Sequence, residues 1–455
     1  MIRNLAHLFI YVALFSFAPA VGAAQAVPAG PVQSALVTFQ IAVYYADPPM
    51  ADPMTTLSTV AAKGWPKLTL TKIAAKPTGM MLHARVEKDV PKNYRVADVK
   101  MLGYFGRGLS KAQIDALQGS KQALVMDFAH PALHAMEGLR SAYGVAERVA
   151  RDTGGYLWDE ETREMFTPDK WREIRLAGWT QGVPDVSRHT TIHSYKNGEL
   201  ARAITLGMSK FGLPDLVIDQ FPWSSGEPVA HTLNLVAQAL AEGALIGPKG
   251  HIDVGVNMIA NKQSRATIAA QLAPKAGDIL ARLALVAAVR DEGDPQNQLA
   301  EITFTRYAGA NVQARQDSML RELFGAPGKI KSVQHDDALE NESARARKAL
   351  FAMQSDFNRG LEPGEYIRVK APFATKSGGV EWMWVELITW KGDTLSGLLK
   401  NEPFDIPALH AGQMVNVSLN DVFDYTRTYR DGRQVGNTTQ AIIMKMQGEL
   451  KEMPY

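Results

Sequence analysis

The 455-residue chain has no cysteine, which excludes disulfide scaffolds, thiol nucleophiles and zinc sites built on thiolates. It also has almost no surplus charge, since 49 Lys and Arg against 47 Asp and Glu give a formal net charge of +2. No window forms the basic stripe that is typical of nucleic-acid-binding proteins. With 46% hydrophobic and 21% charged residues, neither general disorder nor a polytopic membrane protein is expected. The length indicates two or three domains.

The amino terminus has the pattern of a secretory signal. A short positive start is followed by an apolar run over residues 8–18, by Pro19 and by small residues. Residues 24–26 (Ala-Gln-Ala) fit the cleavage pattern best, and residues 21–23 (Val-Gly-Ala) are the second choice. An uncleaved anchor is the alternative, but the apolar run is well short of the ~20 residues that span a bilayer. We expect removal of residues 1–26 and an exported protein, periplasmic or secreted, with no integral membrane segment after cleavage.

The apolar patterns predict an α+β fold, in which helices and strands are interspersed without strict alternation. Two helices are clear, over residues 131–152 and 229–242, each with apolar residues at helical intervals and a glycine at its end. Strands are expected around these two helices, at residues 36–45, 67–73, 80–86, 123–128, 189–195, 201–208 and 216–221.

Three parts are predicted after the leader. They are an α+β domain over residues 33–262, a connecting α/β segment over 263–328 and a β-rich α+β domain over 336–455. The middle part is hard to interpret, because residues 283–289 suit a strand or a helix. In the last part, one leading helix precedes short strands that are expected at residues 366–371, 380–390, 395–400, 414–418 and 441–446.

The last part carries a family resemblance in several ordered motifs. In chain order, the motifs are Glu365–Phe373, Gly379–Val385, Ser396–Pro403, His410–Gly412, Val422–Tyr425, Asp431–Gly432 and Gly436–Thr439. Together they resemble the YegJ-like family, a bacterial domain of unknown function, over about residues 336–446. Two positions depart from the family pattern: Trp382 stands where the family usually has His, and Tyr425 stands where it has Trp. The resemblance implies a domain boundary, and it implies no mechanism because the family has no established activity.

The polar residues of these motifs have two interpretations. In the first they surround a ligand, and the candidate binding residues are Glu381, Trp384, Asn401, Glu402, Asp424 and Asn437. In the second, which we favour, they serve turns and strand ends. Alternation along the strand at 380–390 predicts that Trp382, Trp384 and Trp390 share one face.

The rest of the chain has little recognisable chemistry. Two histidine pairs, His130 with His134 and His189 with His193, have a four-residue spacing but no assignable third ligand, so no metal and no cofactor is expected. The sequence contains no dinucleotide-binding glycine motif, no phosphate-binding loop and no nucleophile elbow. An acidic stretch at 158–164 is expected to form a solvated hairpin, and residues 203–215 a tight buried turn.

Two functions from different classes stay open. The favoured one is a non-catalytic exported protein that binds a protein, peptide or envelope component through its β-rich domain, with no nucleic acid as partner. The alternative is a hydrolase that uses Glu381 and Asp424 as an acid/base pair, which requires the two carboxylates within about 10 Å of each other. We favour binding because position 382, where the family has its His, lacks that common general base.

Overall fold

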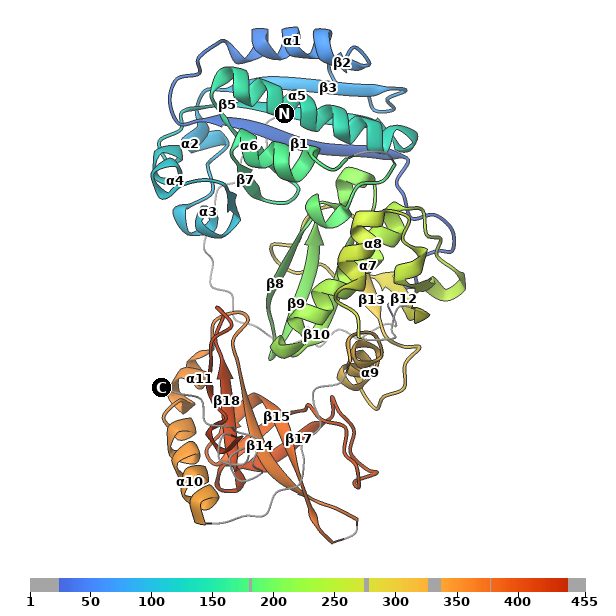
Figure 1. Cartoon of the computed structure of the whole chain (residues 1–455). Coiled ribbons are helices and arrows are strands. Elements are labelled where there is room, and N and C mark those ends of the chain that lie inside the picture. The colour runs from blue at the N-terminus through green and yellow to red at the C-terminus, as the bar shows by residue number, and fades with distance from the viewer. Residues whose placement is uncertain (1–23, 180–181, 274–277, 326–336, 377, 441–455) are drawn as a thin grey trace, which may run out of the picture.

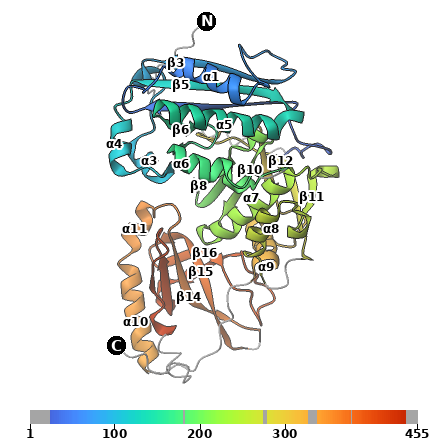
Figure 2. The same cartoon turned by 45° about the horizontal axis from the view of Figure 1, so that its top comes forward.

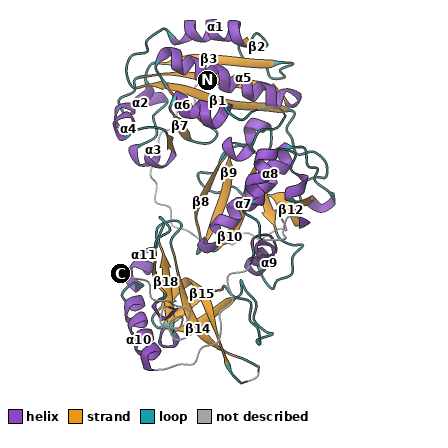
Figure 3. Ribbon diagram, viewed as in Figure 1, coloured by secondary structure: helices purple, strands orange, loops and turns teal. Residues whose placement is uncertain are grey.

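The computed structural model describes residues 24–179, 182–273, 278–325, 337–376 and 378–440. Three β-sheets follow one another along the chain, and Figure 1 shows them as three tiers between the blue N-terminal end and the red C-terminal end. Helices pack beside each sheet (Figure 3). This mixture of sheets and helices confirms the predicted α+β class.

The first sheet has seven strands in the order β2-β3-β5-β1-β6-β7-β4. Its central strand, β1, pairs antiparallel with β5 and β6. The strands are β1 (Leu36–Tyr45), β2 (Leu68–Leu70), β3 (Met80–Glu87), β4 (Gly106–Arg107), β5 (Gln122–Pro131), β6 (Tyr156–Asp159) and β7 (Glu164–Phe166).

Helices cover both faces of the first sheet because β1 is apolar on both sides. Phe39 and Ile41 pack with residues of α1 and α5, whereas Ala42 and Tyr44 pack with residues of α2, α3 and α4. The helices are α1 (Pro53–Gly64), α2 (Val90–Asn93), α3 (Val99–Phe105), α4 (Lys111–Leu117), α5 (Ala135–Thr153) and α6 (Pro168–Trp171). Helix α5, which ends at the left-handed Gly154, confirms the helix predicted there. No helix in the described ranges has the length and apolar character needed to cross a bilayer.

The second sheet has six strands in the order β11-β12-β13-β10-β9-β8. The strands are β8 (Thr191–Asn197), β9 (Leu200–Leu206), β10 (Asp215–Phe221), β11 (His251–Val254), β12 (Ala281–Ala287) and β13 (Leu299–Thr303). The helices α7 (Gly226–Ala241), α8 (Lys262–Ala269) and α9 (Val312–Phe324) accompany it. The ambiguous segment is thus a strand, β12. The boundary expected between residues 262 and 263 falls within this sheet, since β12 and β13 pair with each other and with strands that precede it.

One apolar core joins the first two sheets, with Val37 and Val43 from the first and Ile218 and Leu283 from the second. The turn after β9 lies in this core, and its glycines Gly207 and Gly212 adopt left-handed conformations. The tight buried turn predicted over residues 203–215 is thereby confirmed.

The third sheet forms a C-terminal domain with its own core, and its strand order is β17-β16-β15-β14-β18-β19. The elements are α10 (Asp337–Phe351), α11 (Gln354–Arg359), β14 (Tyr366–Ala374), β15 (Val380–Lys391), β16 (Thr394–Leu399), β17 (Met414–Ser418), β18 (Asp424–Thr428) and β19 (Gln434–Gly436). The leading helix and four of the predicted strands are present. The strand expected at residues 441–446 lies outside the described residues.

An irregularity in β15 corrects the predicted tryptophan face. The pairing of β15 with β16 shifts register between Leu387 and Thr389, as at a β-bulge. Beyond the shift, Trp390 packs in the core of the domain with Val385 and Leu387. Trp390 therefore lies on the core side with Val385, not with the tryptophans at 382 and 384 as strict alternation predicted.

Candidate functional site

A cavity of about 290 Å³ lies between the second sheet and the C-terminal domain. The β8–β9 hairpin and Trp223 form one wall, and the end of α11 together with β15 forms the other. The residues that line it include Lys196, Leu200, Trp223, Phe357, Glu386 and Trp390. Figure 2 shows β15 and β16 of the C-terminal domain next to the second sheet. The volume is near the lower end of the range for small-molecule pockets.

Local sequence explains how each wall is built. Gly198 and Glu199 form a two-residue turn between β8 and β9, and Gly198 has the positive φ of 63° that such turns require. Trp223 follows Pro222 at the end of β10, in a short helical turn. On the other side, α11 ends at Gly360, whose φ of 99° turns the chain toward β14. Segments far apart in the sequence therefore meet at this cavity.

Glu386 is the most unusual residue of the cavity wall, because its carboxylate is buried with only 1% exposure. Its Oε1 accepts a hydrogen bond from the backbone N–H of Ser224 at 3.2 Å, across the boundary between the two parts. Its Oε2 has no hydrogen-bond partner in the described structure. Two cations, Arg368 Nε and Lys400 Nζ, lie 3.9 Å from that oxygen. Burial lowers the pKa of Lys400, and the charge of Glu386 opposes this effect.

The walls combine aromatic rings with charges of both signs. Trp223 and Phe357 supply flat apolar surface, and Lys196 and Glu365 supply opposite charges. The buried Oε2 of Glu386 has no hydrogen-bond partner within the described ranges, and its close polar neighbours are the cations of Arg368 and Lys400 at 3.9 Å. The arrangement suits a ligand with an apolar or planar group and a hydrogen-bond donor.

The six predicted binding residues lie in the C-terminal domain, but none of them is among the residues that line this cavity. Glu381 accepts hydrogen bonds from the backbone N–H groups of Phe404 and Asp405 at distances of 2.9 to 3.3 Å. It thereby fixes a loop that exposes 98% of Phe404. In the described structure, Glu381 stabilises this loop.

Trp384 lies within β15, and Asn401 and Glu402 follow the end of the neighbouring strand β16. The side-chain oxygen of Asn401 accepts a hydrogen bond from the backbone N–H of Trp384 at 2.7 Å. Glu402 accepts from Arg321 of α9 at 2.9 Å and lies 2.9 Å from Nδ1 of His410. Glu402 therefore links the C-terminal domain to a helix of the second sheet.

Asp424 and Asn437 form a third group near the end of β19. The buried carboxylate of Asp424 accepts from the backbone N–H of Thr439 at 2.9 Å and from its hydroxyl at 2.5 Å. Asn437 has a positive φ of 57° and donates its backbone N–H to the carbonyl of Tyr425 at 2.7 Å. These contacts are those of turn residues, and a ligand-binding role for any of the six stays a prediction.

The sheet register separates the two carboxylates of the hydrolase hypothesis. Glu381 pairs with Phe373, and Asp424 pairs with Lys370 on the same strand, β14. Cross-strand partners share a face, and residues three apart on a strand lie on opposite faces. Glu381 and Asp424 therefore lie on opposite faces of the sheet, which does not suit an acid/base pair that acts on one bond.

Residues 322–453 match the model of a family described as an uncharacterized protein conserved in bacteria (DUF2314). The C-terminal domain is a DUF2314 domain. This match supports the domain that the ordered motifs indicated, and the YegJ-like name stays a resemblance. No curated protein and no solved structure matches the chain significantly. At the position where the YegJ-like pattern has His, Trp382 packs its ring 4.7 Å from that of Phe423.

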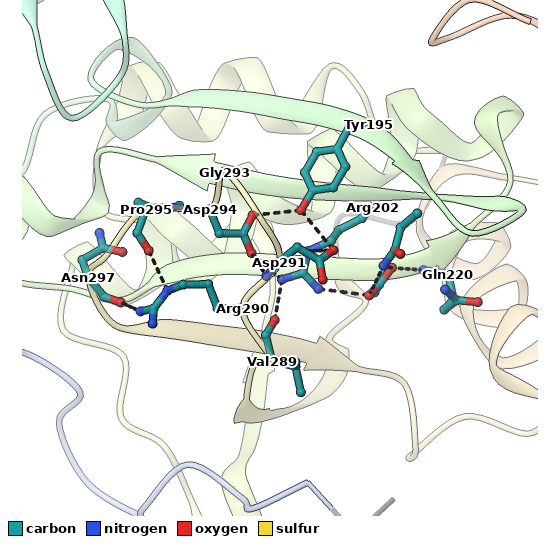
Figure 4. A network of polar contacts seen from close by, with 12 residues as sticks. Tyr195, Arg202, Gln220, Val289, Arg290, Asp291, Gly293, Asp294, Pro295 and Asn297 are labelled. Carbon is teal, nitrogen blue, oxygen red and sulfur yellow. Dashed lines mark hydrogen bonds and ion pairs between the residues drawn. The ribbon is translucent and has the colours of Figure 1, made fainter. Parts of the chain in front are cut away.

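A second polar site lies on the second sheet, away from the DUF2314 domain core (Figure 4). The buried guanidinium of Arg202 donates to Asp219 at 3.0 Å, to Asp294 at 2.8 Å and to the carbonyl of Val289 at 2.7 Å. Tyr195 donates its hydroxyl to Asp294 at 2.8 Å. These bonds hold the loop between β12 and β13 on the sheet, so we assign this network a structural role.

A third polar site corrects the expected solvated hairpin. Asp159, at the start of the acidic turn, is fully buried and lies 2.5 Å from Nζ of Lys210 and 3.2 Å from Arg175. Glu164 is also buried and bonds Arg175 at 2.8 Å. Burial alone would raise the pKa of Asp159, but the charges of Lys210 and Arg175 hold it below its usual value. The acidic residues of the hairpin therefore belong to a buried network of ion pairs between the first two sheets.

The histidine pairs have no metal geometry in the described structure. Within the described ranges, no group of three or more His, Asp or Glu side chains could hold a metal ion. His189 is buried, with its ring stacked on Tyr143 at 5.6 Å. His193 lies on β8 and stacks on Phe105 at 4.6 Å.

The residues that line the cavity were missed as a site by sequence reasoning. Trp223 and Phe357 have no motif around them, and they are more than a hundred residues apart. Glu386 had a signal, because a carboxylate in the middle of an apolar strand needs a partner or a function when it is buried. The sequence pattern thus identifies Glu386 alone. Only the folded chain shows that Trp223 and Phe357 lie in the same cavity wall.

Proposed function

We propose that the protein is an exported, non-catalytic binding protein of the cell envelope, and that its ligand occupies the cavity beside the DUF2314 domain. The observation that carries this proposal is the composition of the cavity wall. Trp223 and Phe357 provide aromatic surface, and Glu386 provides a buried oxygen that lacks a hydrogen-bond partner in the described structure. Concave sites of this composition, at the boundary between two parts of a chain, are where small ligands bind.

The charges around the cavity narrow the class of ligand. Lys196 and Arg359 are basic, whereas Glu199 and Glu365 are acidic, so the wall does not select a ligand of one charge. A short peptide segment fits this pattern, because it combines an apolar side chain with backbone donors and acceptors. An apolar group between the rings and a donor at Glu386 would satisfy both kinds of surface.

Export is supported by the leader pattern of the sequence. Residues 8–18 form a predominantly apolar run, and small residues follow Pro19 as they do at secretory cleavage sites. A chain without cysteine keeps its fold in an oxidising compartment without disulfide exchange. An envelope location would bring the cavity into contact with peptide and glycan fragments of that compartment.

Isothermal titration calorimetry of the full chain tests this function. The probes are a panel of tripeptides with apolar central residues and, as a second chemical class, short N-acetylglucosamine oligomers. We expect at least one tripeptide to bind and Trp223→Ala to weaken its binding by about tenfold or more, because buried tryptophans dominate binding sites.

The matched control for this experiment is Trp65→Ala. Trp65 is a partly buried tryptophan that packs against the first sheet, remote from the cavity. This variant should bind as the wild type does. Failure of every probe to bind, or equal losses in both variants, would contradict a ligand site in the cavity.

A further inference from the structure

We infer that the free edge of β8 accepts an extended peptide as an additional strand, and that one side chain of this peptide enters the adjacent cavity. The inference deepens the proposed function and rests on it, because it names the ligand of that cavity. In this mode, most of the recognition comes from the backbone N–H and C=O groups of β8. The side chains of Trp223 and Glu386 contribute only within the cavity. Strand addition to an exposed sheet edge is a recurrent mode of peptide recognition.

β8 is the terminal strand of the second sheet and pairs with β9 alone. Its last pair, Asn197 with Leu200, closes a two-residue turn, so these two residues exchange backbone hydrogen bonds. Hydrogen-bonded pairs alternate with non-bonded pairs along the ladder. The N–H and C=O groups of Ile192, Ser194 and Lys196 therefore point away from β9.

These outward groups are available to a partner. No backbone or side-chain hydrogen bond joins the amides of Ile192, Ser194 or Lys196 to other described residues. The side chains of Ser194 and Lys196 are exposed. Three alternating peptide groups are what an added strand of about five residues pairs with.

The edge leads directly to the cavity. Lys196, the last outward residue of β8, lines the cavity, as do Glu199 of the following turn and Leu200 of β9. A peptide paired with Ile192 and Ser194 would thus place its next residues beside Trp223. About 290 Å³ accommodates one or two side chains, which is the room a peptide anchor needs.

The surroundings of the edge favour a single peptide over a second copy of this chain. In Figures 1 and 2, α3 of the first sheet and α11 of the DUF2314 domain lie at the two ends of β8 and extend beyond it. Arg430 of this domain lies over the ring of Tyr104 of α3 at 4.1 Å, so the flanking parts touch each other. Two such flanked edges would obstruct each other, whereas an extended segment is narrow enough to reach the strand.

Ser194→Pro tests this inference selectively. Proline removes an N–H that points away from β9, so the β8–β9 ladder stays intact while the outer edge is blocked. Ser194→Ala is the matched control, because it removes the hydroxyl and keeps the N–H. The probe is a phage-displayed library of random dodecapeptides, selected on the full-length wild-type chain, and the enriched sequences are synthesised for titration.

We expect an enriched peptide to bind Ser194→Ala as it binds the wild type and to bind Ser194→Pro about tenfold more weakly or worse. Circular dichroism should show the same folded state for both variants. If Trp223→Ala loses binding and Ser194→Pro does not, strand addition is wrong while the cavity site stands. If neither variant loses binding, both proposals are wrong. The inference is also wrong if the selection enriches no peptide. It is equally wrong if the free protein forms a dimer that Ser194→Pro dissociates, because the edge would then bind a second copy of the chain.

Discussion

The carboxylate of Glu386 accepts a hydrogen bond at 3.2 Å from the backbone N–H of Ser224, and this bond joins the DUF2314 domain to the second sheet at the cavity wall. The second oxygen of Glu386 faces two cations at 3.9 Å, Arg368 and Lys400, without a hydrogen bond. One side chain thus links the two parts of the protein and balances the charge of two neighbouring cations.

Glu386→Gln should destabilise the protein by about 1–3 kcal/mol, because it removes the negative charge that balances the buried Lys400 and the partly buried Arg368. The free energy of unfolding, measured by urea denaturation of the full chain, checks this expectation. Glu199→Gln is the control, since Glu199 is an exposed residue of the same cavity and should change stability by less than about 0.5 kcal/mol. An equal loss in the two variants would contradict the role given to Glu386.

Asp159→Asn should destabilise the protein more strongly, by about 3–5 kcal/mol, because Lys210 and Arg175 would keep buried charges without their shared partner. Asp169→Asn removes a carboxylate that is 87% exposed and bound to Arg151, so its effect should stay below about 1 kcal/mol. Urea denaturation of both variants measures the difference. A stability of Asp159→Asn equal to that of the wild type would show that the network is dispensable.

Glu161 should make stability depend on pH. Burial, with the nearby charge of Asp159, raises its pKa from 4.5 to about 7, while its bond to Ser209 opposes the shift. The folded state therefore holds a proton that the unfolded state releases, and the free energy of unfolding falls as the pH rises from 4.5 to 7. Glu161→Gln removes this titrating group. The free energy of unfolding of the variant, relative to that of the wild type, should therefore rise by about 2–3 kcal/mol between pH 4.5 and 7. Thermal unfolding at several pH values measures it, with Glu173→Gln as an exposed control; a flat difference would contradict the burial of Glu161.

Processing of the leader should occur after Ala23, the second choice of the sequence pattern. Gln25 and Ala26 pair with β12, where the carbonyl of Gln25 accepts a hydrogen bond from the N–H of Ala287 at 2.8 Å. Cleavage after Ala26 would remove this contact, which is worth about 0.5–1.5 kcal/mol. Intact mass of the protein purified from the periplasm decides between the sites. A chain that begins at Val27 would contradict the placement, and an uncut cytoplasmic chain would contradict export.

Local pattern was sufficient for much of the fold. The helical periodicity of α5 and the glycine at 154 that ends it are properties of neighbouring residues, so the sequence predicted both. The turn after Leu206 was equally local, because its glycines adopt left-handed conformations that other residues avoid. The ordered motifs from Glu365 onward located the DUF2314 domain for a different reason, namely resemblance.

Long-range contacts account for what the sequence did not predict. The acidic hairpin around Asp159 resembled a solvated turn because its partners, Arg175 and Lys210, come from other segments. Trp390 lies on the face opposite to the predicted one because the register of β15 shifts after Leu387. No local sequence pattern marked that bulge. The cavity depends on the meeting of the β8–β9 turn with β15, which only the packed chain reveals.

Hydrogen–deuterium exchange of the full chain, with and without an enriched peptide, tests directly whether the β8 edge and the adjacent cavity form one peptide site. We expect slower exchange over residues 192–200 and 386–391, because the peptide pairs with β8 and fills the cavity. Residues 80–87 of the first sheet, which form β3, should be unchanged. Protection confined to another edge, such as β17, or no protection at residues 192–200 and 386–391, would contradict the claim that this edge and cavity form the binding site.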